Sequence, residues 1–133
     1  MATVENVILG ITASAGKPGY SDIAYSYELH PGESDSAEER EFTVTVSLWG
    51  EDVFDDDVLA VELDEHTIKC SRTAPGEPLK VARVFEVETK LLDEDVVGDD
   101  EVYLVVEARS ESGAELALEE RVSGKSNVVI GDF

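Results

Sequence analysis

The sequence lacks several features that would place it in a familiar class of protein. It has a single cysteine, Cys70, so no disulfide bond can form within the chain, whereas small secreted domains often carry an even number of cysteines. No apolar run approaches the ~20 residues that a membrane-spanning helix needs. The N-terminal segment has no basic region and carries Glu5, which argues against a secretory signal. We therefore expect a cytoplasmic protein in which Cys70 is a small core residue.

Basic residues are scarce, because 10 Lys and Arg stand against 31 Asp and Glu and give a formal net charge of −21. Phosphate groups would be repelled, so we expect no nucleic acid and no membrane as a partner. Net charge of this size keeps proteins soluble in a salt-rich cytoplasm, which indicates a halophilic organism. The alternative is an ordinary cell in which the protein binds divalent cations or a basic partner.

Catalytic motifs are missing as well. The only histidines are His30 and His66, and no Gly-x-Ser-x-Gly motif occurs. A hydrolase would need one of these histidines in a pocket, beside a Ser, a Cys or a carboxylate. Residues 123–126 (SGKS) resemble the end of a phosphate loop, but Glu119 stands where that loop requires a glycine, so we expect a tight turn. The sequence therefore favours a protein that is not an enzyme.

What the chain does contain is a period of two in its apolar residues, which is typical of half-buried β-strands. The clearest run is Phe42, Val44, Val46 and Leu48, and we expect the neighbouring Trp49 to be buried in the core. The other runs are 7–11, 23–29, 59–63, 68–70, 81–87, 102–108, 114–122 and 128–130. Residues 14–19 and 74–76 read as turns, and the polar segment 31–40 reads as a loop.

These strands define the expected fold class. The length of 133 residues fits one domain, 1–133, with a core of its own. Many short strands separated by turn signals predict an all-β protein. We expect an antiparallel two-sheet sandwich with Greek-key connections and seven to nine strands, immunoglobulin-like in the broad sense.

Two segments of the chain share a pattern. With one fixed offset, residues 42–57 (FTVTVSLWGEDVFDDD) match residues 85–100 (FEVETKLLDEDVVGDD) in a Phe-x-Val-x-x-x-Leu spacing and in several acidic positions. Each copy runs from a strand with one apolar face into an acidic loop. This repeat predicts two strands in comparable settings, with both acidic loops at one end of the sandwich.

The acidic loops are the candidate binding site, because hard cations such as Ca²⁺ are bound by ~6–8 oxygen atoms. The candidate metal ligands are Asp52, Asp56, Asp57, Asp93, Asp95, Asp99 and Asp100. No cofactor other than calcium is expected. The alternative interpretation is a solvated halophilic surface, and calorimetric titration with Ca²⁺ in molar KCl distinguishes the two.

Two resemblances to known families rest on short motifs. Residues 48–52 (LWGED), followed by Asp56 and Asp57, resemble the calcium loop of C2 domains, although Gly50 stands where its first aspartate belongs. That resemblance implies a calcium-binding module. The order of an L-x-G-[DE]-D loop, 92–95 (LDED), 100–102 (DEV) and 126–128 (SNV) resembles small uncharacterised bacterial β-sandwich proteins.

The functional prediction is a non-enzymatic binding or structural β-sandwich module of a halophilic organism. A calcium-binding, C2-like module that uses the two acidic loops is one alternative. A subunit of a larger viral or cellular assembly is another. We expect a protein partner, and the sequence leaves its identity and the oligomeric state open.

The charge predicts a fold that salt stabilises. Spread over a sphere of about 18 Å radius, the net charge costs the folded chain roughly 16 kcal/mol at physiological salt and roughly 7 kcal/mol in ~1 M salt. The unfolded chain also repels itself, so the effect of salt on the free energy of unfolding is a fraction of this difference. The denaturation midpoint should therefore rise between low and molar KCl, which circular dichroism can follow. A midpoint that stays flat or falls would contradict the halophilic interpretation.

Overall fold

The computed structural model describes residues 2–51, 57–71, 73, 76–92, 100–111 and 119–131. They form eight strands, one short α-helix and one 3-10 turn. The strands are β1 (Thr3–Ala13), β2 (Tyr20–His30), β3 (Glu41–Gly50), β4 (Asp57–Lys69), β5 (Leu79–Glu88), β6 (Asp100–Glu111), β7 (Glu119–Lys125) and β8 (Val129–Gly131). The helical elements are α1 (Glu33–Ala37) and η1 (Thr89–Leu91). Within these residues, no helix is long and apolar enough to span a bilayer.

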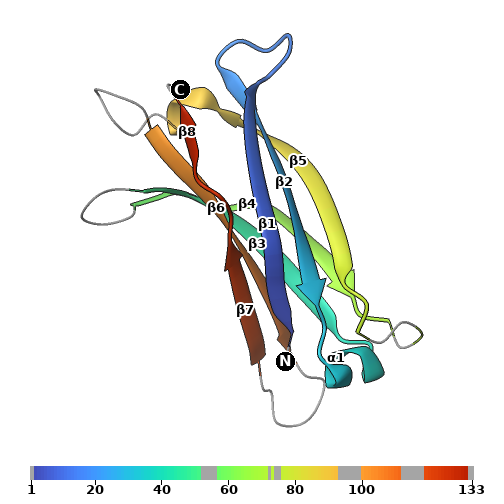
Figure 1. Cartoon of the computed structure of the whole chain (residues 1–133). Helices are drawn as coiled ribbons and strands as arrows, with labels where there is room; N and C mark the ends of the chain where they lie inside the picture. The colour runs from blue at the N-terminus through green and yellow to red at the C-terminus, as the bar shows by residue number, and fades with distance from the viewer. Residues whose placement is uncertain are drawn as a thin grey trace.

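The strands are arranged in two antiparallel sheets that form the layers of a sandwich (Figure 1). Sheet A has the strand order β1-β2-β5. Sheet B has the order β4-β3-β6-β7, and β8 also pairs with β6. The chain changes sheets after β2, β4 and β5, so β2 pairs with β5 and β3 pairs with β6, as in Greek-key sandwiches. The predicted all-β, two-sheet sandwich is confirmed, while its immunoglobulin-like character and the single domain 1–133 stay predictions.

The core lies between the sheets and is built by the predicted alternation. In β3, the four apolar residues of the clearest run are buried, and Thr43 and Thr45 of the other parity are half-buried. In β2, the buried side chains are those of Ile23, Tyr25, Tyr27 and Leu29. Cys70 is also buried, as expected for a small core residue. The period of two therefore decides which face of each central strand points inward.

The expectation that Trp49 lies in the core is wrong. Its side chain is half-buried on the outer face of sheet B, where its ring stacks on that of Tyr103 with 6.4 Å between centroids. The Lys125 ammonium lies 3.9 Å from the centroid of the Tyr103 ring. Because the four core residues of β3 share one parity, Trp49 must point to the opposite face.

The segment 31–40, predicted as a loop, contains α1. The Asp35 side chain is buried, its Oδ2 accepts a hydrogen bond from the Gly32 amide at 2.8 Å, and its Oδ1 lies 3.4 Å from Nε of Arg40. Such partners offset the free-energy cost of burying a carboxylate. Composition alone indicated a solvated segment, because it does not reveal which carboxylate the fold will bury.

The repeat prediction of two strands in comparable settings is also wrong. Phe42 lies in β3, which pairs with strands on both sides, and Phe85 lies in β5, which pairs with β2 alone among the described strands. Phe42 is fully buried, and Phe85 is only partly buried. A shared side-chain spacing predicts a strand but not the number of its neighbours. The strand predicted over 114–122 starts later, at Glu119, and residues 112–118 lie outside the described part of the chain.

One edge of sheet A is held against sheet B by residues near the C-terminal end. The Asn127 side chain accepts a hydrogen bond from the Leu9 amide at 2.8 Å and donates one to the Leu9 carbonyl at 3.1 Å. Gly124 lies inside β7 against β1, where a Cβ atom would come within 2.9 Å of methyl groups of Val4 and Val7. The turn predicted at 123–126 is therefore displaced, since the connection to β8 spans residues 126–128.

This close approach predicts that Gly124→Ala lowers the free energy of unfolding by about 1–3 kcal/mol, because the added methyl group must displace stiff valine side chains. Gly10→Ala is the matched control. A Cβ atom at Gly10 would meet nothing within 4 Å, so this variant should be neutral or up to about 1 kcal/mol more stable. Chemical denaturation measures both changes, and equal midpoints would contradict the role of Gly124.

Candidate functional site

The predicted calcium site falls largely outside the described part of the chain. This holds for the side chains of Asp52, Asp56, Asp57, Asp93, Asp95, Asp99 and Asp100. The backbone of Gly50 pairs with Asp57 on one side and with Val102 on the other, so the ends of β3, β4 and β6 that border the acidic loops lie at one end of sheet B. Among the described residues, no group of three or more His, Cys, Asp or Glu side chains is placed to hold a metal ion. The calcium site stays a prediction.

The two histidines named by the sequence lie in different settings. Nε2 of His30 is 3.1 Å from a carboxylate oxygen of Glu5 and 3.1 Å from one of Glu28, on the outer face of sheet A. His66 is largely buried in β4, and its Nε2 lies 2.6 Å from the Tyr27 hydroxyl. Neither histidine lines the three surface hollows around Ala24, Lys80 and Thr43.

His66 belongs to a polar cluster that joins the two sheets on the side where β4 and β5 lie. The Tyr25 hydroxyl donates a hydrogen bond of 2.6 Å to Oδ2 of Asp64. The Arg83 guanidinium donates to both oxygens of the same carboxylate, at 2.7 and 3.3 Å. Nδ1 of His66 lies 4.0 Å from Asp64 Oδ2, beyond hydrogen-bond range. We call these residues, together with Tyr27, the inter-sheet cluster.

The inter-sheet cluster has a defined electrostatic state. Burial, and then the positive charge of Arg83, lower the pKa of His66 against the opposing effect of Asp64. Burial tends to raise the pKa of Asp64, but the hydrogen bonds from Arg83 and Tyr25 outweigh it and lower that pKa. Burial also raises the pKa of both tyrosines, Tyr25 and Tyr27. At neutral pH, the cluster therefore pairs an ionised Asp64 with Arg83 beside a neutral His66.

The inter-sheet cluster suits a structural role, because its side chains bond to one another between the two sheets. A tyrosine beside a histidine beside an aspartate has the order of a nucleophile, a base and an orienting acid. However, Tyr27 is only 1% exposed, and its hydroxyl is occupied by His66. The members come from three strands, and the residues that bond are 39 and 19 positions apart, so no local sequence pattern predicts this cluster.

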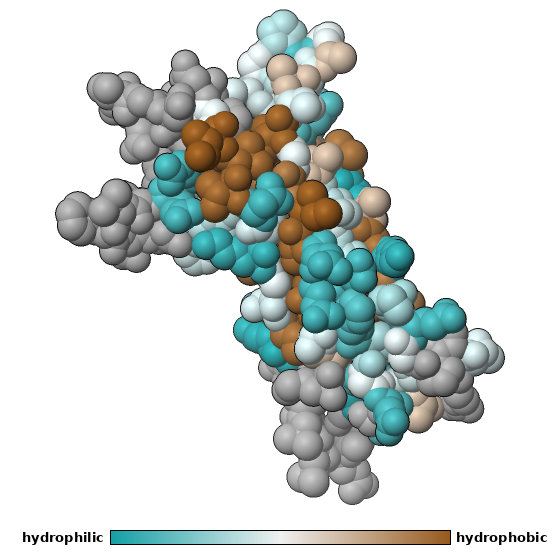
Figure 2. Space-filling view, in the orientation of Figure 1, coloured by the Kyte–Doolittle hydropathy of each residue, from teal (hydrophilic) through white to brown (hydrophobic). Residues whose placement is uncertain are grey.

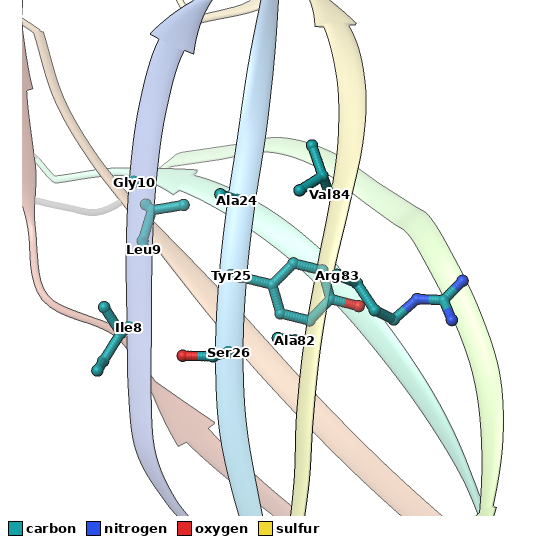
Figure 3. Close-up of a pocket in the computed structure, with 9 residues that line it drawn as sticks. All are labelled: Ile8, Leu9, Gly10, Ala24, Tyr25, Ser26, Ala82, Arg83 and Val84. Atoms are coloured by element: carbon teal, nitrogen blue, oxygen red, sulfur yellow. The ribbon is translucent and has the colours of Figure 1, made fainter.

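The second feature is a groove on the outer face of sheet A, away from the core. We call it the outer-face groove, and its volume is about 460 Å³. The outward side chains that line it are Ile8, Gly10, Ala24, Ser26, Ala82 and Val84. Figure 3 shows Ile8 and Val84 at opposite corners of the groove, with the small residues between them. A second hollow of about 220 Å³ shares Ile8, Ser26 and Ala82 and continues the groove toward Glu28 and Lys80.

Strand register brings these residues together. Ile8 pairs with Ser26, which pairs with Ala82, and Gly10 pairs with Ala24, which pairs with Val84. The result is two adjacent rows across all three strands of sheet A. No charged side chain points outward from either row. The sequence carries no local sign of the outer-face groove, because Ala, Gly and Ser at outward positions look like ordinary strand residues.

The groove exposes apolar side chains in a highly charged protein. Ile8 is 59% exposed and Val84 is 66% exposed. The space-filling view shows hydrophobic surface in several places, with hydrophilic side chains between them (Figure 2). The patch covers roughly 200 Å², which a monomer can expose without binding anything, so its setting in a chain of net charge −21 is what makes it a candidate interaction surface.

The protein is a two-layer β-sandwich that carries an apolar groove on the outer face of sheet A. No protein-family model matches the chain, and no curated protein sequence matches it. The chain is similar to several solved structures, including the following two. A protein from Archaeoglobus fulgidus is 8% identical, with a TM-score of 0.55 over 98% of this chain and 99% of that one. Spo0M, a sporulation control protein from Bacillus subtilis, is 16% identical, with a TM-score of 0.48 over 96% of this chain.

These comparisons concern the fold alone. The chain spans about half of the Spo0M structure, since the match covers 48% of that chain. The expected similarity to β-sandwich proteins without an assigned activity is confirmed by the Archaeoglobus structure. The resemblance to the calcium loop of C2 domains stays a prediction.

The lowered pKa of His66 predicts an acid-sensitive fold. His66 is harder to protonate in the folded chain than in the unfolded chain, where its pKa is about 6.5, so stability falls as the pH drops below that value. The slope is at most about 1.4 kcal/mol per pH unit. His66→Gln should lose this slope between about pH 7.5 and 5.5, and the matched variant His30→Gln should keep it. Denaturation at several pH values measures all three, and the same slope in His66→Gln would contradict the assignment.

Proposed function

We propose that the protein is a non-enzymatic binding module that uses the outer-face groove to hold a protein partner. The observation that carries this proposal is the pair of outward rows without charge, which cross all three strands of sheet A in a chain of net charge −21. An apolar face of this kind is costly to leave open, and a protein partner would remove it from water.

The remaining features support a binding role over catalysis. The outer-face groove contains no Ser, Cys or carboxylate beside a histidine, since Ser26 is its only residue of these types. Nε2 of His66 is hydrogen-bonded to the Tyr27 hydroxyl within the inter-sheet cluster, and His30 lies on the surface between two glutamates. The halophilic setting is part of the proposal, because the acidic surface suits a salt-rich cytoplasm.

Site-specific photo-crosslinking in the protein's own cells tests this proposal. A photo-crosslinking amino acid, p-benzoylphenylalanine, replaces Val84 in the groove or Val61 on β4. The two valines are matched, because their exposed fractions are 66% and 63%. Position 84 should give one defined protein adduct, and position 61 should give none, as judged by mass spectrometry. Equal adducts from both positions, or none from position 84, would contradict the proposed binding face.

A further inference from the structure

We infer that the partner of the outer-face groove is a basic protein surface with an aliphatic side chain that projects into the space above Gly10 and Ala24. This inference rests on the proposed function and adds the chemistry of the partner. It draws on three observations, namely the shape of the groove floor, the size of the apolar area and the charge of its rim.

The floor of the groove is shaped to receive a side chain. Gly10 and Ala24 pair across β1 and β2, and both leave room between the projecting side chains of Ile8 and Val84 (Figure 3). A Cβ atom added at Gly10 would meet nothing within 4 Å, and its φ is not in the left-handed region, so the open space is not required by the backbone. An incoming aliphatic side chain would fill this space and contact Ile8 and Val84.

The apolar area is too small to be a whole interface. Three strands about 4.8 Å apart and a few residues of about 3.3 Å rise give roughly 200 Å². A specific interface buries about 800 Å² on each partner. The residues around the groove must therefore take part, and their charges decide what can bind.

The rim of the groove is acidic. At one end, Asp22 pairs in register with Glu86, and at the other end, Glu5 pairs with Glu28. Among the described residues, two lysines and His30 lie beside these four carboxylates, and Arg83, which is bound to Asp64, also lines the groove. Lys17 is bound to Glu86 at 2.6 Å, and Lys80 pairs in register with Glu28. A partner that covers the rim must therefore carry positive charge, whereas a second copy of this chain would bring another net charge of −21.

Three synthetic peptides test the inference by calorimetric titration, at ~0.15 M salt and in molar KCl. The first has a central Val-Ile-Val and two lysines at each end. The second keeps the lysines and has serines at the centre. The third keeps Val-Ile-Val and has glutamates at the ends. We expect the first peptide to bind at least about tenfold more tightly than either of the others, because it alone supplies both the apolar centre and the basic rim.

Matched variants of the protein locate the binding. Gly10→Leu fills the groove floor without changing any charge, and it should weaken the first peptide about tenfold, to the level of the serine peptide. Thr67→Leu places the same leucine side chain at an exposed position of β4 and should leave binding unchanged. Both variants should melt no lower than the original protein, which shows that the fold is intact.

The other outcomes separate this inference from the proposed function. If the glutamate peptide binds as well as the lysine peptide and Gly10→Leu weakens both, the groove is a binding site but its partner is not basic. If the protein self-associates in sedimentation and Gly10→Leu makes it monomeric, the occupant is a second copy and the basic partner is wrong. If no peptide binds better than the serine peptide, or Gly10→Leu changes nothing, the inference is overturned.

Discussion

The rest of the structure depends on the pair of hydrogen bonds between the Asn127 side chain and the backbone of Leu9. β1 is an edge strand, and an edge strand has unpaired backbone groups that invite a wrong partner. Asn127 satisfies the amide and the carbonyl of Leu9, and Gly124 lets β7 come close. At this contact, Leu9 lies in the core and its neighbours Ile8 and Gly10 lie outside.

The row that contains Leu9 runs across all three strands of sheet A, and its residues bond to residues outside sheet A. Leu9 pairs with Tyr25, and Tyr25 pairs with Arg83. Tyr25 and Arg83 both bond to Asp64 of sheet B. The outer-face groove consists of the rows on either side of this one, facing the opposite way. Leu9, Tyr25 and Arg83 also line the groove, so the polar contacts between the sheets contribute to its shape.

Charge and apolar surface have complementary effects in this protein. A net charge of −21 opposes self-association, so an exposed apolar groove is a smaller risk of aggregation here than on a neutral protein. In the binding role that we propose, the same charge selects among partners, since apolar contact is available to many surfaces but the acidic rim favours basic ones. The groove would then provide contact area, and the rim would provide specificity.

The sequence by itself determined the strands and the parity of their side chains, because a period of two is a local property. Phe42 and Val44 are buried as that pattern predicts. Only the tertiary structure decided which strands became neighbours, and with that the site. Tyr25 meets Asp64 39 residues away, and Ile8, Ser26 and Ala82 form one row only because β2 lies between β1 and β5. Such contacts depend on long-range pairing, for which local side-chain spacing carries no information.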